Sequence, residues 1–235
     1  VYCSVTGFGQ DGPRAQKAGY DFMIQGMTGI MDITGEPEGM PQKVGVAFAD
    51  VFTGLYGVIG IQAALAQRAR TGKGQHIDMA LFDCMLAAQA NQNLNYLTTG
   101  KSPQRMGNAH PSIVPYQVFP VGDGHIVIAC GNNRQFHNLA RAPNREDWIE
   151  DPIFADNITR IANRAEVVRQ IIETLSHWAK LDVLPVLEAA GVPSGPINTI
   201  AEALEDPQTL FRQMRISPEG IPGVRTPIKF SDSSL

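Results

Sequence analysis

The sequence contains few cysteines. Cys3, Cys84 and Cys130 are the only three in 235 residues, they lie far apart, and no two of them form a C-x-x-C pair. An odd number of scattered cysteines does not suit a disulfide framework, and it fits a reducing compartment better than an oxidising one. We therefore expect a cytoplasmic protein.

A surplus of positive charge is also missing. The chain carries 19 lysine and arginine residues against 23 aspartate and glutamate residues, which gives a formal net charge of −4. Binding to nucleic acid or to an anionic membrane surface depends on a broad field of positive charge. We expect neither a nucleic acid partner nor a membrane partner.

No apolar run is long enough to suggest a membrane-spanning helix. The most apolar stretch, residues 51–66, is interrupted by Gln62 and three glycines. It falls short of the roughly 20 residues that cross a bilayer. No signal peptide is recognisable either. The sequence therefore predicts no membrane span.

Several familiar catalytic signatures are absent. The five histidines show neither H-x-x-x-H spacing nor a cysteine–histidine cluster suited to a metal. There is no G-x-S-x-G motif and no Walker loop, and Gly7-Phe8-Gly9 is too short for a dinucleotide fingerprint. We expect no metal site, and hydrolase and nucleotide-binding interpretations lose their support.

The composition that remains is that of an ordinary globular protein. Hydrophobic residues make up 43% of the chain and charged residues 18%, so a chain of this length can bury a core and form one or two domains. The chain opens inside the strand-like run at residues 1–5 and closes on the polar run at residues 231–235. Neither looks like a natural terminus, so we expect part of a longer polypeptide.

Strand and helix patterns alternate along the first hundred residues. The predicted strands are at 1–5 and 76–81. Helices are predicted at about 19–34, at 51–70, and from the end of the second strand to about residue 97. A glycine-rich loop follows the first strand, where ligands bind in open α/β sheets. Gly54, Gly57 and Gly60 each cost the central helix about 1 kcal/mol relative to alanine. We expect another group to approach that face closely.

A change of composition at residues 98–103 suggests a linker. Beyond it, strand patterns at 116–119 and 125–129 flank Gly122-Asp123-Gly124, the strongest hairpin signal in the chain. Helices are predicted at 135–141, 164–178, 182–190 and 201–212, the last with a break at Pro207. Asn163 and Glu166 have the spacing of a capping box for the 164–178 helix.

Asp50 is the main candidate for chemistry. It follows the apolar approach at residues 44–49 and directly precedes a predicted helix, which is an N-cap position. As a simple cap it would contribute about 1 kcal/mol, and the local sequence alone favours this interpretation. A helix N-terminus also keeps a carboxylate ionised, as a nucleophile must be. Gly131-Asn132-Asn133 also has two interpretations. It is either a simple turn or a loop that closes over a reaction centre.

A family resemblance emerges from several motifs in a fixed order. They are TGFGQDGP at 6–13, GYD at 19–21, Asp50 before a helix, TGKGQ at 71–75, R-x-GN-x-HP at 105–111, IVPY at 113–116, DG at 123–124, GN-x-x-QF at 131–136 and GVP-x-GPI at 191–197. Together they resemble class III CoA-transferases, a family that includes formyl-CoA and carnitine CoA-transferases and the related α-methylacyl-CoA racemases. Essentially the whole chain is covered.

The resemblance implies a function for Asp50, which matches the family's catalytic aspartate. It would attack a donor acyl-CoA and then carry the CoA as an aspartyl thioester, from which a carboxylic acid acceptor takes it. Coenzyme A and acyl-CoA would be substrates, and no metal or permanently bound cofactor is needed. Gly131, Asn132 and Asn133 match the family's mobile glycine-rich loop, which would shelter the intermediate.

Three more residues gain an interpretation from the resemblance. Tyr20 stands where the racemases have a histidine that moves the α-proton, and a phenol with a pKa of about 10 is a poor substitute. Asp21 matches a neighbouring acidic position, and Lys17 matches a CoA-contacting lysine with a shift of one residue. Transfer is therefore preferred, with an α-methylacyl-CoA racemase and a catalytically inactive CoA-binding relative as the alternatives.

The resemblance also implies an α/β architecture. Residues 1–98 would be the C-terminal part of a Rossmann-like large domain, 99–112 a linker, 113–217 a small α+β domain and 218–235 a return linker. Family members begin with a half that holds most CoA contacts, which is not in this chain, and they form interlocked homodimers. We therefore expect the fragment alone to be inactive. The small domain is most similar to that of enzymes with dicarboxylic donors such as succinyl-CoA.

Overall fold

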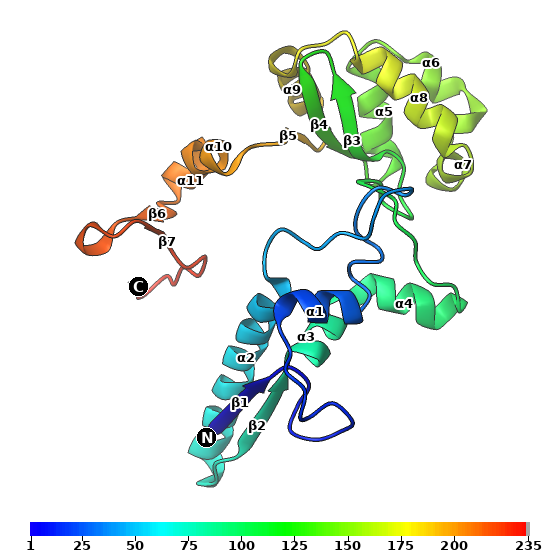
Figure 1. The fold of residues 1–235 in the computed structure, drawn as a ribbon. Coiled ribbons are helices and arrows are strands. Elements are labelled where there is room, and N and C mark those ends of the chain that lie inside the picture. The colour runs from blue at the N-terminus through cyan, green and yellow to red at the C-terminus, as the bar shows by residue number, and fades with distance from the viewer. Residues whose placement is uncertain (234–235) are drawn as a thin grey trace. The chain divides into compact units, whose positions relative to one another are not determined.

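The computed structural model describes residues 1–233, which form two compact units, Val1–Pro111 and a second that begins at Ser112. Figure 1 shows helices and strands in both. This mixed α/β content agrees with the predicted fold class. The finer division into a Rossmann-like part, two linkers and a small domain stays a prediction, and so does the dimer.

The first unit is built on a strand–helix–strand crossover. Its elements are β1 (Tyr2–Thr6), α1 (Asp21–Met27), α2 (Phe48–Thr71), β2 (His76–Ala80), α3 (Leu81–Ala88) and α4 (Ala90–Thr99). The two strands pair in parallel, with Tyr2 opposite His76 and Thr6 opposite Ala80. Parallel strands need a long connection, and α2 supplies it alongside both strands (Figure 1). Both strands agree with the sequence prediction.

The helix α2 is longer than the sequence pattern suggests. Gly72 ends it in the left-handed conformation (φ 74°), and its N–H donates to the Arg68 carbonyl at 2.8 Å. By length and composition its 24 residues suffice to cross a membrane. In this structure 22% of its most apolar 18-residue stretch is buried. The prediction that this apolar segment is too short to cross a bilayer is therefore wrong. Core helices of soluble proteins meet the same criteria, so no membrane role follows.

The close approach expected along the glycines of α2 is found at one of them. A Cβ added to Gly60 would meet the Ile77 side chain at 3.6 Å. Added at Gly54 or Gly57, it would meet nothing within 4 Å among the described residues. Only Gly60 thus has a packing reason within the part of the chain that the structure describes.

Two helices in the first unit are shorter than the sequence pattern indicates. The helix predicted at 19–34 ends at Met27, because the Thr28 hydroxyl bonds the Ile24 carbonyl at 2.7 Å and Gly29 adopts a φ of +92°. The helix predicted through about residue 97 is two helices, α3 and α4. Ala90 separates them with a φ of 40°, which interrupts the helical path.

The second unit contains a three-stranded antiparallel sheet in the order β3 (Tyr116–Val121), β4 (Gly124–Ala129) and β5 (Ser194–Pro196). The predicted hairpin is confirmed, with Tyr116 opposite Ala129. Its turn is held by two contacts to the start of α9 and the residues just before it. Gly122 N–H donates to the Trp178 carbonyl at 2.8 Å, and the Asp123 carboxylate accepts from Lys180 N–H at 2.8 Å.

Helices connect the strands of this unit and continue beyond them. They are α5 (Asn133–Arg141), α6 (Asp147–Glu150), the 3-10 turn η1 (Pro152–Phe154), α7 (Asn157–Ala162), α8 (Arg164–Leu175), α9 (Lys180–Ala189), α10 (Ile200–Glu205) and α11 (Pro207–Phe211). The chain ends in the short strands β6 (Arg215–Ile216) and β7 (Gly223–Val224), with the 3-10 turn η2 (Pro218–Gly220) between them. The predicted break at Pro207 is confirmed.

The capping box predicted at Asn163 is wrong. The Asn163 amide donates to the Thr159 carbonyl at 2.9 Å, and Glu166 binds Arg169 instead of the helix start. The ion pair and a bond from Gln170 lower the pKa of Glu166 to about 2. A capping box forms at Thr199 and Glu202, which share the same spacing.

A continuous core fills the second unit. The rings of Phe136, Trp148 and Phe154 stack on one another with centroids 5.4 to 6.4 Å apart. On α8, Val167 and Ile171 are fully buried, as the helical spacing predicted. The first unit has a smaller core of Ile24, Ala49, Leu81 and Met85, which joins α1, α2 and α3. That core fixes the start of α2, where Asp50 lies.

Candidate functional site

Asp50 is the third residue of α2, and its side chain is exposed to solvent. The predicted N-cap position is wrong, because the N-cap residue is Ala47 and the Val51 N–H already donates to the Ala47 carbonyl at 3.0 Å. No hydrogen bond or ion pair engages the Asp50 carboxylate within residues 1–233. The carboxylate thus lies unpaired in the first turn, near the positive end of the helix dipole.

Asp21 performs the capping that was predicted for Asp50. One oxygen of its carboxylate accepts a hydrogen bond from the Ala49 N–H at 2.9 Å, and the other accepts from the Gln25 amide at 2.8 Å. Asp21 is the first residue of α1, so the start of one helix closes the start of another. The helix end is thereby satisfied without Asp50, whose carboxylate is left available for chemistry.

Tyr20 and Lys17 precede this contact on the chain. Tyr20 is the N-cap residue of α1 and is 73% exposed. The next residue, Asp21, accepts the hydrogen bond from the Ala49 N–H at the start of α2. Lys17 is exposed in a turn, with its N–H donating to the Arg14 carbonyl at 2.9 Å. The structure thus brings Asp21 to the start of α2, where Asp50 lies, whereas within residues 1–233 no contact ties the side chains of Tyr20 and Lys17 to them.

A close approach of two glycines shapes the loop that carries Lys17. A Cβ on Gly7 would lie 2.6 Å from the Gly19 Cα, and a Cβ on Gly19 would lie 2.6 Å from the Gly7 Cα. Neither residue has a positive φ, so contact alone requires glycine here. Backbone on both sides leaves no flexible side chain that could move aside.

Gly7→Ala is expected to lower the free energy of unfolding by about 1–3 kcal/mol, because the backbone must shift to admit the methyl group. Urea denaturation of the full-length protein that contains these residues measures the loss. Gly54→Ala is the matched control, since an added Cβ there meets nothing within 4 Å in the described chain. Equal stability of both variants would refute the steric explanation.

The loop Gly131-Asn132-Asn133 belongs to the second unit and is held by three hydrogen bonds. The Gly131 N–H donates to Gln135 Oε1 at 2.8 Å, and Asn132 Oδ1 accepts from the Gln135 N–H at 3.0 Å as the cap of α5. Asn133 Oδ1 accepts from Arg160 at 2.9 Å. These contacts fix the loop in the form seen here.

Arg160 is a residue that the sequence analysis did not single out. It is fully buried, and it donates to the carbonyls of Val114 and Phe154, both at 2.8 Å. Its guanidinium lies 4.5 Å from the Phe136 ring centroid. Burial lowers the pKa of this arginine and raises that of the neighbouring Cys130 thiol to about 12. Its partners are mainly backbone carbonyls, which no sequence motif marks.

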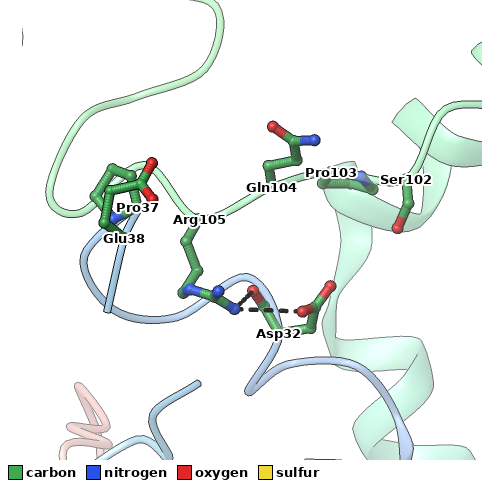
Figure 2. A pocket seen from close by; sticks show the side chains of 7 residues that line it. All are labelled: Asp32, Pro37, Glu38, Ser102, Pro103, Gln104 and Arg105. Carbon is green, nitrogen blue, oxygen red and sulfur yellow. Dashed lines mark hydrogen bonds and ion pairs between the residues drawn. The ribbon is translucent and has the colours of Figure 1, made fainter. Parts of the chain in front are cut away.

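Arg105, from the R-x-GN-x-HP motif, lies at a pocket of about 440 Å³ (Figure 2). Its Nη1 donates to the Asp32 carbonyl at 2.9 Å and lies 3.3 Å from the Asp32 carboxylate. The lining adds a second carboxylate, that of Glu38. The pocket includes none of the predicted catalytic residues.

No metal centre is found in the part of the chain that the structure describes. Among residues 1–233, histidine, cysteine, aspartate and glutamate form no group of three or more that could hold an ion. The start of α2 carries the unpaired Asp50 carboxylate beside the capping carboxylate of Asp21, and an unpaired carboxylate can act as a nucleophile.

Comparison with known proteins places this chain in a family. The model of CoA-transferase family III matches residues 1–235. The succinate–glutarate CoA-transferase of Agrobacterium fabrum is 52% identical over 241 residues, which cover 100% of this chain and 60% of the relative. The succinyl-CoA:glutarate CoA-transferase of Mus musculus is 40% identical over 210 residues, which cover 89% of this chain and 48% of the relative.

Solved structures agree with these matches. The crystal structure of a CAIB/BAIF family protein from Brucella suis superposes with a TM-score of 0.88 at 59% identity, covering 100% of this chain and 62% of the other. The chain thus spans about half to two thirds of the length of the proteins it matches. The match extends from the first strand through the site and the second unit, and the chain belongs to CoA-transferase family III.

Proposed function

We propose that the protein transfers coenzyme A from an acyl-CoA donor to a carboxylic acid, with Asp50 as the carrier. The observation that supports this most directly is an exposed, unpaired carboxylate in the first turn of a 24-residue helix whose capping is performed by another residue, Asp21. Such a carboxylate has no partner to displace and lies near the positive end of the helix dipole, which suits a nucleophile. Family membership supplies the reaction class.

The proposed reaction has two matching halves. An Asp50 oxygen attacks the thioester carbonyl of the donor and expels the CoA thiolate, which gives a mixed anhydride. The thiolate then attacks the Asp50 acyl carbon, and the donor acid leaves as a carboxylate while CoA stays on Asp50 as a thioester. The acceptor carboxylate attacks this thioester and expels the thiolate, which finally attacks the acceptor acyl carbon and releases the Asp50 carboxylate.

The neighbouring residues receive supporting roles in this proposal. The exposed Tyr20 hydroxyl would contact the reacting acyl group, and Lys17 would bind an anionic part of CoA. The Gly131-Asn132-Asn133 loop would shelter the intermediate. Because the Gly131 N–H already donates to Gln135, it becomes available to an oxyanion only when the Gln135 side chain moves.

The substrates are proposed to be dicarboxylates or their CoA esters, with succinyl-CoA as the donor. This rests on the names of the relatives, which include succinate–glutarate CoA-transferase and, at 40% identity, the acetyl-CoA:oxalate CoA-transferase of Acetobacter aceti. We further propose a homodimer in the cytoplasm. Racemisation is disfavoured by Tyr20, whose phenol is a weak base in its neutral form.

Trapping with hydroxylamine tests the proposed function. The full-length protein that contains these residues, incubated with succinyl-CoA and then with hydroxylamine, is expected to carry a hydroxamate on Asp50, located by peptide mass spectrometry. Acyl exchange without this adduct would contradict the aspartyl thioester. Deuterium uptake at the α-carbon of a 2-methylacyl-CoA would favour the racemase, and a protein that does neither would be an inactive relative.

A further inference from the structure

The amide of Gln25 is buried at the start of α2. Gln25 lies on α1 and is 0% exposed. Its Nε2 donates to the Asp21 carboxylate at 2.8 Å and to the Val46 carbonyl at 3.3 Å, while its Oε1 accepts from the Val44 N–H at 2.9 Å. One side chain thus joins the capping carboxylate to the segment that leads into Asp50.

The three partners match a primary amide and no other common side chain of that length. Two partners are acceptors and one is a donor, and an amide presents two N–H donors and one carbonyl acceptor. A carboxylate would set an acceptor against the acceptors of Asp21 and Val46, and an apolar chain would leave all three groups unsatisfied in a buried place. The contacts also fix which end of the amide faces which partner.

The segment held by Gln25 has little else to define its path. Residues 41–47 form neither helix nor strand, and Val46 is exposed. The core contact of Ile24 with Ala49 fixes the helix after this segment, and Gln25 fixes the segment itself. Asp21, which Gln25 orients, holds the Ala49 N–H immediately before Asp50. The path of the backbone at the start of α2, and with it the direction of the Asp50 side chain, therefore depends on this amide.

We propose that Gln25 is a positioning residue for the transferase reaction. It fixes the 44–46 segment and the Asp21 carboxylate, and through them it holds the Asp50 carboxylate in line with the thioester carbonyl. This inference rests on the proposed function of Asp50. It adds a residue that touches neither substrate nor the reacting atoms and acts through Asp21 and the backbone.

Gln25→Met is expected to lower kcat about 10- to 100-fold, because a displacement of about 1 Å at the nucleophile has an effect of that size. KM for succinyl-CoA is expected to change less than about twofold, because the methionine alters no group that binds CoA. The assay uses the full-length protein, with folding checked by circular dichroism and thermal melting.

Gln89→Met is the matched control. Gln89 is also a buried glutamine of the first unit, but its amide donates to the Thr28 carbonyl at 2.7 Å and not to the segment before Asp50. Its loss is expected to lower the melting temperature, as the loss of Gln25 does, and to leave kcat within about twofold. A difference in kcat between the two variants at similar stability is the signature of positioning.

Gln25→Glu adds a readout that a purely structural role would not produce. The introduced carboxyl faces Asp21 in a buried place, so burial and the like charge raise its pKa. Above that pKa the side chain cannot donate, and below it the bound proton restores one donated hydrogen bond to Asp21. The ratio of variant to wild-type kcat is therefore expected to rise as the pH is lowered from about 8 to about 6.

The outcomes separate this inference from the function on which it rests. A wild-type protein that yields no Asp50 hydroxamate overturns both. A wild-type protein that does, together with a Gln25→Met kcat within twofold or equal losses in Gln25→Met and Gln89→Met, overturns the inference alone. Unfolding of both Gln25 variants would also overturn it, because the amide would then hold the fold. A flat pH ratio for Gln25→Glu would do the same.

Discussion

Replacing Asp50 by asparagine is expected to lower the rate of acyl-CoA exchange by roughly 10⁴-fold or more. An amide oxygen is neutral and cannot form the mixed anhydride, so the step that carries the CoA is lost rather than slowed. The fold should survive, because Asp21 and not Asp50 caps α2. Only the interaction of the charge with the helix dipole is removed, which is worth about 0.3–1 kcal/mol.

Asp83→Asn is the control for this prediction. Asp83 is the third residue of α3, as Asp50 is the third residue of α2, so both substitutions remove a first-turn carboxylate in the same unit. Exchange between succinyl-CoA and a labelled dicarboxylate, followed by chromatography, measures both variants. The Asp83 variant should keep its rate within about twofold. An Asp50→Asn variant as active as wild type would end the proposal of an aspartyl carrier.

Local patterns were sufficient for elements that depend on their own residues. The alternation in β1 and β2, the hairpin turn at Gly122-Asp123-Gly124 and the buried face of α8 all follow from the side-chain periods of strands and helices. Each pattern lies in the element's own residues, even where the partner is far along the chain, as it is for β1 and β2. These elements could therefore be predicted without knowledge of the tertiary contacts.

Local patterns failed where a distant residue decides the structure. The N-terminus of α2 was placed too late because its cap is Asp21, which lies 28 residues before Ala49 and cannot be recognised from the residues at 47–50. Similarly, Asn163 has the right spacing for a capping box, but its amide turns back to Thr159 in the preceding helix. Spacing alone does not distinguish it from Thr199, where the box forms.

The candidate site was predictable in part for the same reason. Asp50 entered through a family resemblance, because its local sequence favoured a simple cap. Gln25 and Arg160 were missed because their partners are backbone groups far along the chain, 19 residues away for Val44 and 46 for Val114. Buried polar residues with backbone partners carry no motif. In a single sequence, only their position on an otherwise apolar helix face marks such residues.

Replacing Arg160 by alanine is expected to destabilise the second unit by about 3 kcal/mol. The carbonyls of Val114 and Phe154 would lose their donors in a buried place, at about 1–3 kcal/mol each. The side chain also leaves a void beside Phe136. Removing a buried charge relieves its desolvation, which offsets part of the loss. The balance favours destabilisation, because the two carbonyls stay buried in the variant.

Arg160→Lys and Arg169→Ala complete this experiment. Lysine keeps the charge but lacks the planar fork that reaches two carbonyls and Asn133 together, so we expect more than half of the destabilisation to remain. Arg169 forms exposed ion pairs with Glu166 and Glu173, which water screens, so its removal should lower stability much less than the loss of Arg160. Urea denaturation measures the loss of stability in each variant, and hydrogen exchange resolved by peptide shows where in the chain it occurs. Because Arg160 also holds Asn133, faster exchange at residues 131–135 should accompany its loss, and unchanged exchange there would show that the loop is held without it.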